Sequence, residues 1–184
     1  PLEQQLYLLR YFYAYYYEYK KIMACISHHL RKINVVSIGC GSCIDGLALK
    51  HVVKGPSGYL GIDCVEWTYN LPLSDSCVIH NIRITENTSG YLKDATILFF
   101  PKSLSDISYS EMNGIKKWIQ QSVLENNEIC VAASFVYNSM YDDKNHTADQ
   151  FMRYQEILSI LKTKNYVKDE YRSFTVKEKE DSKK

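Results

Sequence analysis

Apolar positions along the chain switch repeatedly between the spacing of a helix and that of a strand. From residue 2 to about 30 they recur every three or four residues, including Leu6, Leu9 and Tyr13, which predicts a helix. The same spacing predicts helices from 45 to about 53, after Ser108, and from 148 to about 162. The apolar runs between these helices predict strands at 35–38, 59–63, 77–82, 95–100 and 128–135.

The later helices carry sharper signals. Ser108 and Glu111 have the spacing of a capping box, so a helix should begin there. Its expected buried face holds Met112, Ile115, Ile119 and Val123. The last helix is expected to turn Phe151, Tyr154, Ile157, Leu158 and Leu161 inward. Residues 166–176 predict one or two closing strands.

Strands that are apolar throughout and alternate with helices indicate a parallel sheet covered on both faces. We therefore expect an α/β fold, a Rossmann-like doubly wound and mostly parallel sheet with an N-terminal helix added. The expected parts are a tyrosine-rich helix at 1–32, a cofactor domain at 33–176 and a charged tail at 177–184. Ligands of such sheets bind beyond the carboxyl ends of the strands, where the strand order reverses.

Charge and cysteine content narrow the expected function. The 184 residues carry a formal net charge of +1, which gives no general attraction to nucleic acid or an anionic membrane. The six cysteines are scattered through apolar runs, as buried free thiols of a reducing compartment would be. We find no signal-peptide pattern and no apolar run long enough to span a bilayer, and expect a cytoplasmic protein without a membrane partner.

The segment after the first predicted strand carries the chemistry. Gly39 and Gly41 have no Cβ atom, so the backbone there can turn sharply and approach a ligand. The helix that follows presents unpaired N–H groups and a partial positive charge to that ligand. Asp63 ends the second predicted strand 24 residues after Gly39, where an acid can accept hydrogen bonds from both hydroxyls of a ribose.

These two motifs resemble class I S-adenosylmethionine-dependent methyltransferases. The segment Ser-Ile-Gly-Cys-Gly-Ser at 37–42 is similar to their first motif, and Gly-Ile-Asp at 61–63 to their second. The resemblance implies S-adenosylmethionine as cofactor and methyl transfer to an acceptor. The residues it assigns to the cofactor are Gly39, Cys40, Gly41, Ser42, Asp63, Cys64, Asn81 and Ile82. Cys43 departs from the pattern, since the family has a third glycine there.

The fourth predicted strand is where the family places acceptor chemistry. Phe-Phe-Pro-Lys-Ser at 99–103 lacks both the Asn/Asp-Pro-Pro-aromatic and the Pro-Cys motifs that serve acceptors on nucleic-acid bases. We therefore expect a small molecule or a protein as acceptor. Lys102 is a candidate catalytic residue, although capping of the next helix by Lys102 and Ser103 is the favoured interpretation. Tyr11 is the other candidate, because the N-terminal tyrosines resemble those that cover the cofactor in small-molecule methyltransferases.

Other functions remain open. Cys40 and Cys43 form a C-x-x-C at a helix start, as in thiol–disulfide oxidoreductases, but that hypothesis leaves Asp63 without a role. No second C-x-x-C or matched histidine pair completes a zinc site, so we expect no metal. Ile44 stands where a nicotinamide dehydrogenase would have its third glycine. A non-catalytic binding module that keeps the cofactor fold is the main alternative.

Overall fold

The computed structural model describes residues 2–28, 30–68, 77–85, 90–125, 129–135 and 144–162, with the side chains of 123, 144–147 and 162 left out. Its elements alternate as the apolar spacing predicts. In chain order they are α1 (Leu2–Ser27), β1 (Ile33–Ile38), α2 (Ile44–Val52), β2 (Ser57–Asp63), β3 (Cys77–Asn81), β4 (Ile97–Pro101), α3 (Tyr109–Leu124), β5 (Cys130–Ser134) and α4 (Lys144–Lys162).

The five strands form one parallel sheet in the order β3-β2-β1-β4-β5. The chain adds strands outward on one side of β1 and then crosses to β4 on the other side. That reversal between β1 and β4 is the topological switch point of a doubly wound fold. The predicted α/β, Rossmann-like fold class is confirmed.

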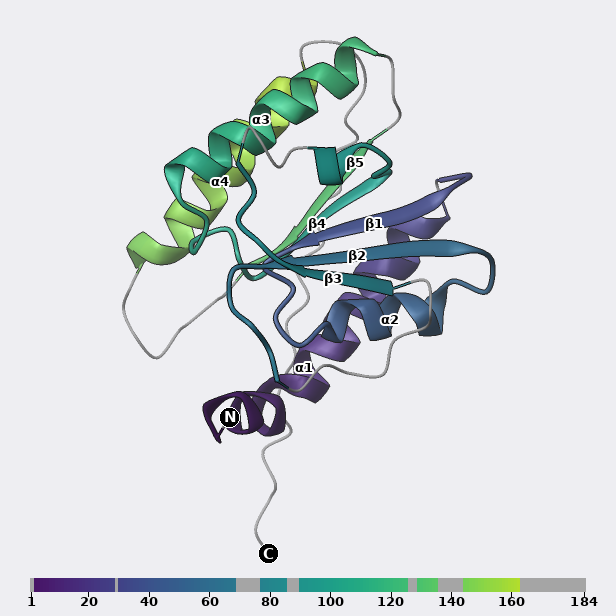
Figure 1. Cartoon of the computed structure of the whole chain (residues 1–184), viewed down its shortest axis with the longest axis vertical. Coiled ribbons are helices and arrows are strands. Elements are labelled where there is room, and N and C mark those ends of the chain that lie inside the picture. The colour runs from purple at the N-terminus through teal and green to yellow at the C-terminus, as the bar shows by residue number, and fades with distance from the viewer. Residues whose placement is uncertain are drawn as a thin grey trace, which may run out of the picture.

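Helices cover both faces of the sheet, with α1 and α2 on one side and α3 and α4 on the other (Figure 1). Successive side chains of a strand point to opposite faces. In β1, Val35 accordingly packs with the residues of α1 and α2, whereas Val36 packs with those of α3. In β4, Phe99 likewise packs beneath α1 and α2, whereas Phe100 packs beneath α3 and α4. Both side chains are fully buried.

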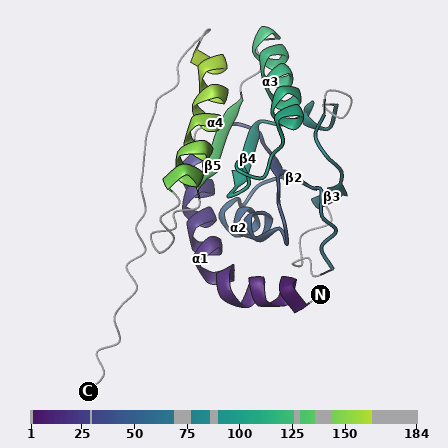
Figure 2. The ribbon, with the colours of Figure 1, turned by 90° about the vertical axis from the view of Figure 1, so that its left-hand side faces the viewer.

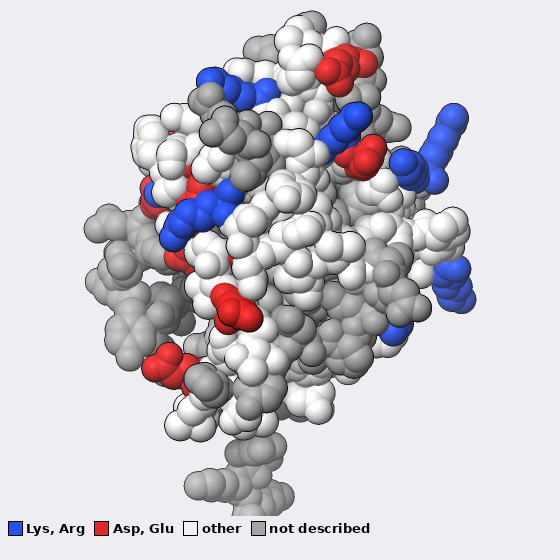
Figure 3. Space-filling view, in the orientation of Figure 1, with Lys and Arg blue, Asp and Glu red and all other residues white. Residues whose placement is uncertain are grey.

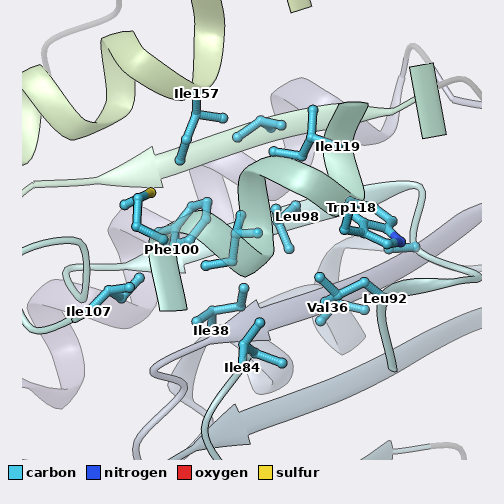
Figure 4. Packing of buried hydrophobic residues seen from close by; sticks show 14 of the residues in the cluster. Val36, Ile38, Ile84, Leu92, Leu98, Phe100, Ile107, Trp118, Ile119 and Ile157 are labelled. Carbon is cyan, nitrogen blue, oxygen red and sulfur yellow. The ribbon is translucent and has the colours of Figure 1, made fainter. Parts of the chain in front are cut away.

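The core beneath α3 and α4 is built from apolar side chains of the strands and both helices (Figure 4). Trp118 and Ile119 of α3, Ile157 of α4 and Leu98 of β4 all belong to this core. At the start of α3, the Ser108 N–H donates to Glu111 Oε2 at 2.9 Å, and the Glu111 N–H donates to Ser108 Oγ at 3.3 Å. These reciprocal bonds confirm the predicted capping box.

One prediction about a helix face is wrong, and the structure settles which face of α1 packs on the domain. Phe151 lies 41% exposed at the edge of α4, although Ile157 and Leu158 of the same predicted face are buried. On α1, the spacing of Leu6, Leu9 and Tyr13 marks a face that is turned to solvent. The face that packs on the domain is the opposite one, through Tyr19 and Met23. The predicted strands in 166–176 and the tail at 177–184 lie outside the described residues.

Candidate functional site

The carboxyl ends of β1, β2 and β3 lie side by side. Ile38 pairs with Ile62 in register, and Asp63 pairs with Asn81. The turn at 39–43 starts here and leads directly into α2. The edge at which doubly wound sheets generally bind their ligands therefore begins here at the glycine turn that the sequence singles out.

Backbone conformation in this turn requires glycine at two positions. Gly39 has φ +73° and Gly41 has φ +54°, in the left-handed region that other residues avoid. A Cβ atom on Gly39 would lie 2.3 Å from the Cβ of Ser103, so a side chain there is excluded. The Gly39 N–H donates to the Ile62 carbonyl at 2.7 Å. The turn is thus held against both β2 and the segment that follows β4.

Asp63 connects the turn to the end of β2. Its Oδ2 accepts the Gly41 N–H at 2.8 Å, and its Oδ1 accepts the Val65 N–H at 2.8 Å. An ionised carboxylate has about four lone-pair positions, so about two remain for other donors. Asp63 is only partly buried, and it lines a hollow in the surface.

This hollow has a volume of about 140 Å³. Its lining residues are Gly41, Asp63, Val65, Glu66, Trp67, Ile79 and Asn81. The Trp67 ring closes one side, because a Cβ on Gly41 would lie only 3.2 Å from it. Pockets for small molecules ordinarily measure about 300–1,000 Å³, so a nucleoside-sized ligand needs Trp67 to move.

Helix α1 is attached to the segment after β2 that carries Glu66 and Trp67. The side-chain amide of Gln4 donates to the Glu66 carbonyl and accepts from the Thr68 N–H, both at 3.0 Å. The Tyr7 ring meets Trp67 edge-on, with centroids 5.4 Å apart. Figure 2 shows this first part of α1 lying across the lower end of the molecule before the helix turns upward.

The other end of α1 is attached beside the carboxyl ends of β4 and β5. Lys102 Nζ lies 2.9 Å from Glu18 Oε2 and donates to the Phe135 carbonyl at 2.9 Å. Ser134 Oγ donates to Glu18 Oε1 at 2.5 Å. The Lys102 ammonium also stands 4.9 Å from the centre of the Tyr15 ring, within range of a cation–π interaction. Lys102 has φ +60°, a strained conformation for a residue with a side chain.

The structure brings some of the predicted cofactor residues together and separates others. Gly41, Asp63 and Asn81 share the hollow. Ile82 instead packs against the core beneath α3 and α4, and Cys40 is buried in the core beneath α1 and α2.

The remaining predicted residues lie around the turn. Gly39 faces Ser103, and Cys64 is exposed. Ser42 is buried, and among the described residues its hydroxyl has no hydrogen-bond partner. Of the two catalytic candidates, Lys102 is engaged by Glu18, and Tyr11 stacks on Tyr15 with centroids 5.2 Å apart. Lys102 and Ser103 do not cap α3, which starts at Tyr109 under the Ser108 cap.

The two thiols of the turn are poorly suited to redox catalysis. Cys40 and Cys43 are both buried, and each sulfur lies 3.8 Å from the Gly41 carbonyl oxygen. The hydrogen bond with Cys43 and burial both raise the pKa of Cys40 well above its usual range. A catalytic dithiol needs an exposed thiolate with a lowered pKa. Cys43 takes φ +63°, in the left-handed region that residues with a side chain seldom adopt.

Trp67, Glu18 and Gln4 are the site residues that the sequence interpretation missed. Trp67 had one available signal, since it is a large aromatic side chain four residues beyond the strand-end acid. Glu18 and Gln4 are polar residues within a tyrosine-rich helix, a position that predicts solvent exposure. Their partners are distant in sequence, and no local pattern connects them.

Other features of the described residues are less informative about function. A larger hollow of about 280 Å³ lies at the amino ends of β1 and β4, the edge where such sheets do not bind ligands. No cluster of three potential metal-ligating side chains occurs in the described part, and none of its helices is long and apolar enough to cross a membrane. Figure 3 shows positive and negative side chains scattered over one face.

Comparisons with known proteins add little to this geometry. The sequence matches no protein-family profile and no curated protein. Among solved structures, it is similar to a cyclopropane-fatty-acyl-phospholipid synthase-like protein from Lactobacillus casei, with a TM-score of 0.42 and 17% identity. The similarity covers 64% of this chain and 48% of that protein. Resemblance at this level says nothing about activity.

Proposed function

We propose that this chain binds S-adenosylmethionine at the carboxyl edge of its sheet and catalyses methyl transfer to a small molecule or a protein. The observation that carries the proposal is the bond between the Gly41 N–H and Asp63 Oδ2, which places a glycine turn and a strand-end acid on one hollow. A glycine turn beside an acid at the end of the next strand is the arrangement by which doubly wound folds commonly bind nucleosides.

The chemistry of the residues at the hollow fits such a cofactor once Trp67 moves aside. Asp63 keeps free lone-pair positions that accept the two ribose hydroxyls, and Gly41 allows the backbone to approach the ligand. Asn81 offers hydrogen bonds and Ile79 an apolar surface on the neighbouring strand. When bound, the cofactor supplies an activated methyl group.

In this proposal α1 positions the acceptor, and no side chain acts as an essential base. Lys102 is held by Glu18 and the Phe135 carbonyl, so its role is to fix α1 over the carboxyl ends of β4 and β5. The rings of Tyr11 and Tyr15 line the side of α1 that faces Lys102. Methyl transfer depends mainly on alignment, which fixed surroundings provide.

The test is calorimetric titration with S-adenosylmethionine, S-adenosylhomocysteine and NAD. We expect the first two to bind and NAD not to bind. Asp63→Asn should weaken binding about 10- to 100-fold, since a charge-assisted hydrogen bond contributes about 1.5–3 kcal/mol. Asp94 is an exposed acid at the opposite edge of the sheet. The variant Asp94→Asn is therefore the matched control and should bind S-adenosylmethionine as the parent does. Unchanged affinity in a folded Asp63→Asn protein would refute the assignment.

A non-catalytic binding module is the second candidate. The close packing of Trp67 on Gly41 favours it, because the ring takes up space that a cofactor would need. The fluorescence of Trp67 separates the two functions. Replacing the only other tryptophan, Trp118→Phe, leaves Trp67 as the sole reporter. Cofactor binding should shift its emission, whereas unchanged emission with no heat of binding would favour the non-catalytic module.

A further inference from the structure

Gln4 of α1 holds residues 64–68, here named the Trp67 segment, by both ends of its side-chain amide. Its Nε2 donates to the Glu66 carbonyl at 3.0 Å, and its Oε1 accepts the Thr68 N–H at 3.0 Å. Only one orientation of the amide serves both partners, because Glu66 offers an acceptor and Thr68 a donor. Glu66 and Thr68 flank Trp67, so the two bonds fix the backbone on either side of the tryptophan.

The Trp67 ring consequently lies against the glycine turn. A Cβ atom on Gly41 would lie 3.2 Å from the ring, which is tighter than ordinary van der Waals contact. Tyr7 of α1 meets the ring edge-on, with centroids 5.4 Å apart. Trp67, Gly41 and Asp63 line the same hollow of about 140 Å³. The space that a nucleoside-sized ligand needs there is therefore restricted by a ring whose position depends on α1.

The contacts that hold the Trp67 segment are separate from those that anchor α1 in the core. The first part of α1 lies across the lower end of the molecule, and the rest of the helix turns upward (Figure 2). Tyr19 and Met23 of the later part are buried in the core beneath α1 and α2. Glu3, next to Gln4, is exposed. Loss of the Gln4 bonds should thus release the Trp67 segment by local opening and leave the packing of α1 in place.

We propose that Gln4 is a positioning residue that keeps Trp67 closed over the glycine turn, so that S-adenosylmethionine binds only after the Trp67 segment has moved. This inference rests on the proposed function, because it concerns access to the cofactor site. A ligand that binds only the open form has its apparent affinity lowered by the fraction of protein that is open. Loss of the two Gln4 bonds raises that fraction, since each bond favours the closed form. The close contact between Trp67 and Gly41 is then the resting state of a cofactor site.

Acrylamide quenching of Trp67 fluorescence tests the closed position, in the Trp118→Phe background that leaves Trp67 as the only tryptophan. Gln4→Ala should raise the quenching constant about twofold or more, because opening exposes the ring. Gln4→Glu should have the same effect, since an ionised carboxylate keeps the size of the side chain but cannot donate to the Glu66 carbonyl. Glu3→Ala, a change at the exposed neighbour, is the matched control and should leave quenching unchanged.

Two further measurements separate closure of the site from a structural role. Titration with S-adenosylmethionine should show Gln4→Ala binding about five- to tenfold more tightly than the parent. A residue that merely builds the site would give weaker binding when it is removed. Hydrogen exchange of the Thr68 N–H, measured with both tryptophans present, should be faster in Gln4→Ala, so the test does not depend on Trp118→Phe folding.

The outcomes for Gln4→Ala are distinguishable once circular dichroism establishes that the variant folds. Unchanged quenching and unchanged exchange at Thr68 would overturn the inference. Equal or weaker binding of S-adenosylmethionine would also overturn it, because Gln4 would then not limit access to the site. Stronger quenching with no binding by either parent or variant would instead overturn the proposed function and confine the inference to the hold of Gln4 on Trp67.

Discussion

Asp45 is a fully buried carboxyl group in the first turn of α2, close to the candidate site. Both of its oxygens accept the Tyr59 hydroxyl at 3.0 Å. Burial raises its pKa from 3.8 to about 6, against the lowering effect of the hydrogen bond from Tyr59. The folded protein therefore retains a proton on Asp45 between about pH 4 and pH 6, where the unfolded chain has released it.

This difference makes stability depend on pH. Because the folded pKa is raised, the Asp45 contribution to the free energy of unfolding falls as pH rises through this window, by at most about 3 kcal/mol. Asp45→Asn keeps an oxygen for the Tyr59 hydroxyl and removes the titration. We expect the parent to lose stability relative to Asp45→Asn between pH 4 and pH 7 in urea unfolding. A pH-independent difference would contradict this account.

At the scale of the elements, Glu18 determines how firmly α1 is attached. It pairs with Lys102, whose side chain is 11% exposed, and accepts from Ser134. Glu18→Ala leaves the Lys102 ammonium with the Phe135 carbonyl as its remaining hydrogen-bond acceptor among the described residues. We expect a loss of about 2 kcal/mol in free energy of unfolding, between the values for exposed and buried pairs.

Glu156→Ala is the matched control for that change. Glu156 pairs with Lys116 across α3 and α4, and its side chain is 44% exposed. Its loss should cost about 0.5 kcal/mol. Equal losses in the two variants, measured by urea unfolding, would mean that Glu18 has no special role in holding α1.

The sequence predicts the elements better than it predicts the contacts between them. The glycine turn and Asp63 are recognisable because their chemistry depends on near neighbours and on one fixed spacing. The buried face of α1 is not, because tyrosines occur all around the helix and either face would pack. The prediction that Phe151 is buried is wrong for a related reason. Periodicity specifies a helix face but not how far along the helix the core extends.

The site was predicted only in part for the same physical reason. Gly41 and Asp63 are linked by a hydrogen bond between consecutive strands. Glu18 acts on Lys102, 84 residues away, where nothing in either local segment specifies the partner. Trp67 lies against the turn because Tyr7 and Gln4 hold its loop, and those contacts arise only after α1 has packed.

At the scale of the whole molecule, two separate cores lie on opposite faces of one sheet. Phe99 belongs to the core beneath α1 and α2, and Phe100 to that beneath α3 and α4. Each substitution to leucine should cost about 1.5 kcal/mol. The double variant should show the sum within about 0.5 kcal/mol, because the two side chains share no core.

A pair within one core provides the comparison. Ile97 and Phe99 are both buried beneath α1 and α2. Ile97→Val combined with Phe99→Leu should depart from additivity by more than about 0.5 kcal/mol in urea unfolding. Coupling of that size between Phe99 and Phe100 would instead show that the sheet transmits strain from one face to the other.

The attachment of α1 to β5 has a consequence for synthesis on the ribosome. Glu18 and Ser134 are 116 residues apart, so α1 emerges long before the strand end that fixes it. At about 5–20 residues per second, roughly 6 to 23 s separate the two events. Throughout that interval Glu18 lacks its partners Lys102 and Ser134 in turn, while the residues of α2 that pack on α1 have already been made. Translation therefore supplies the packing partners of α1 on β1 and α2 early and the Ser134 attachment last, so the helix reaches its final position only when β5 is complete.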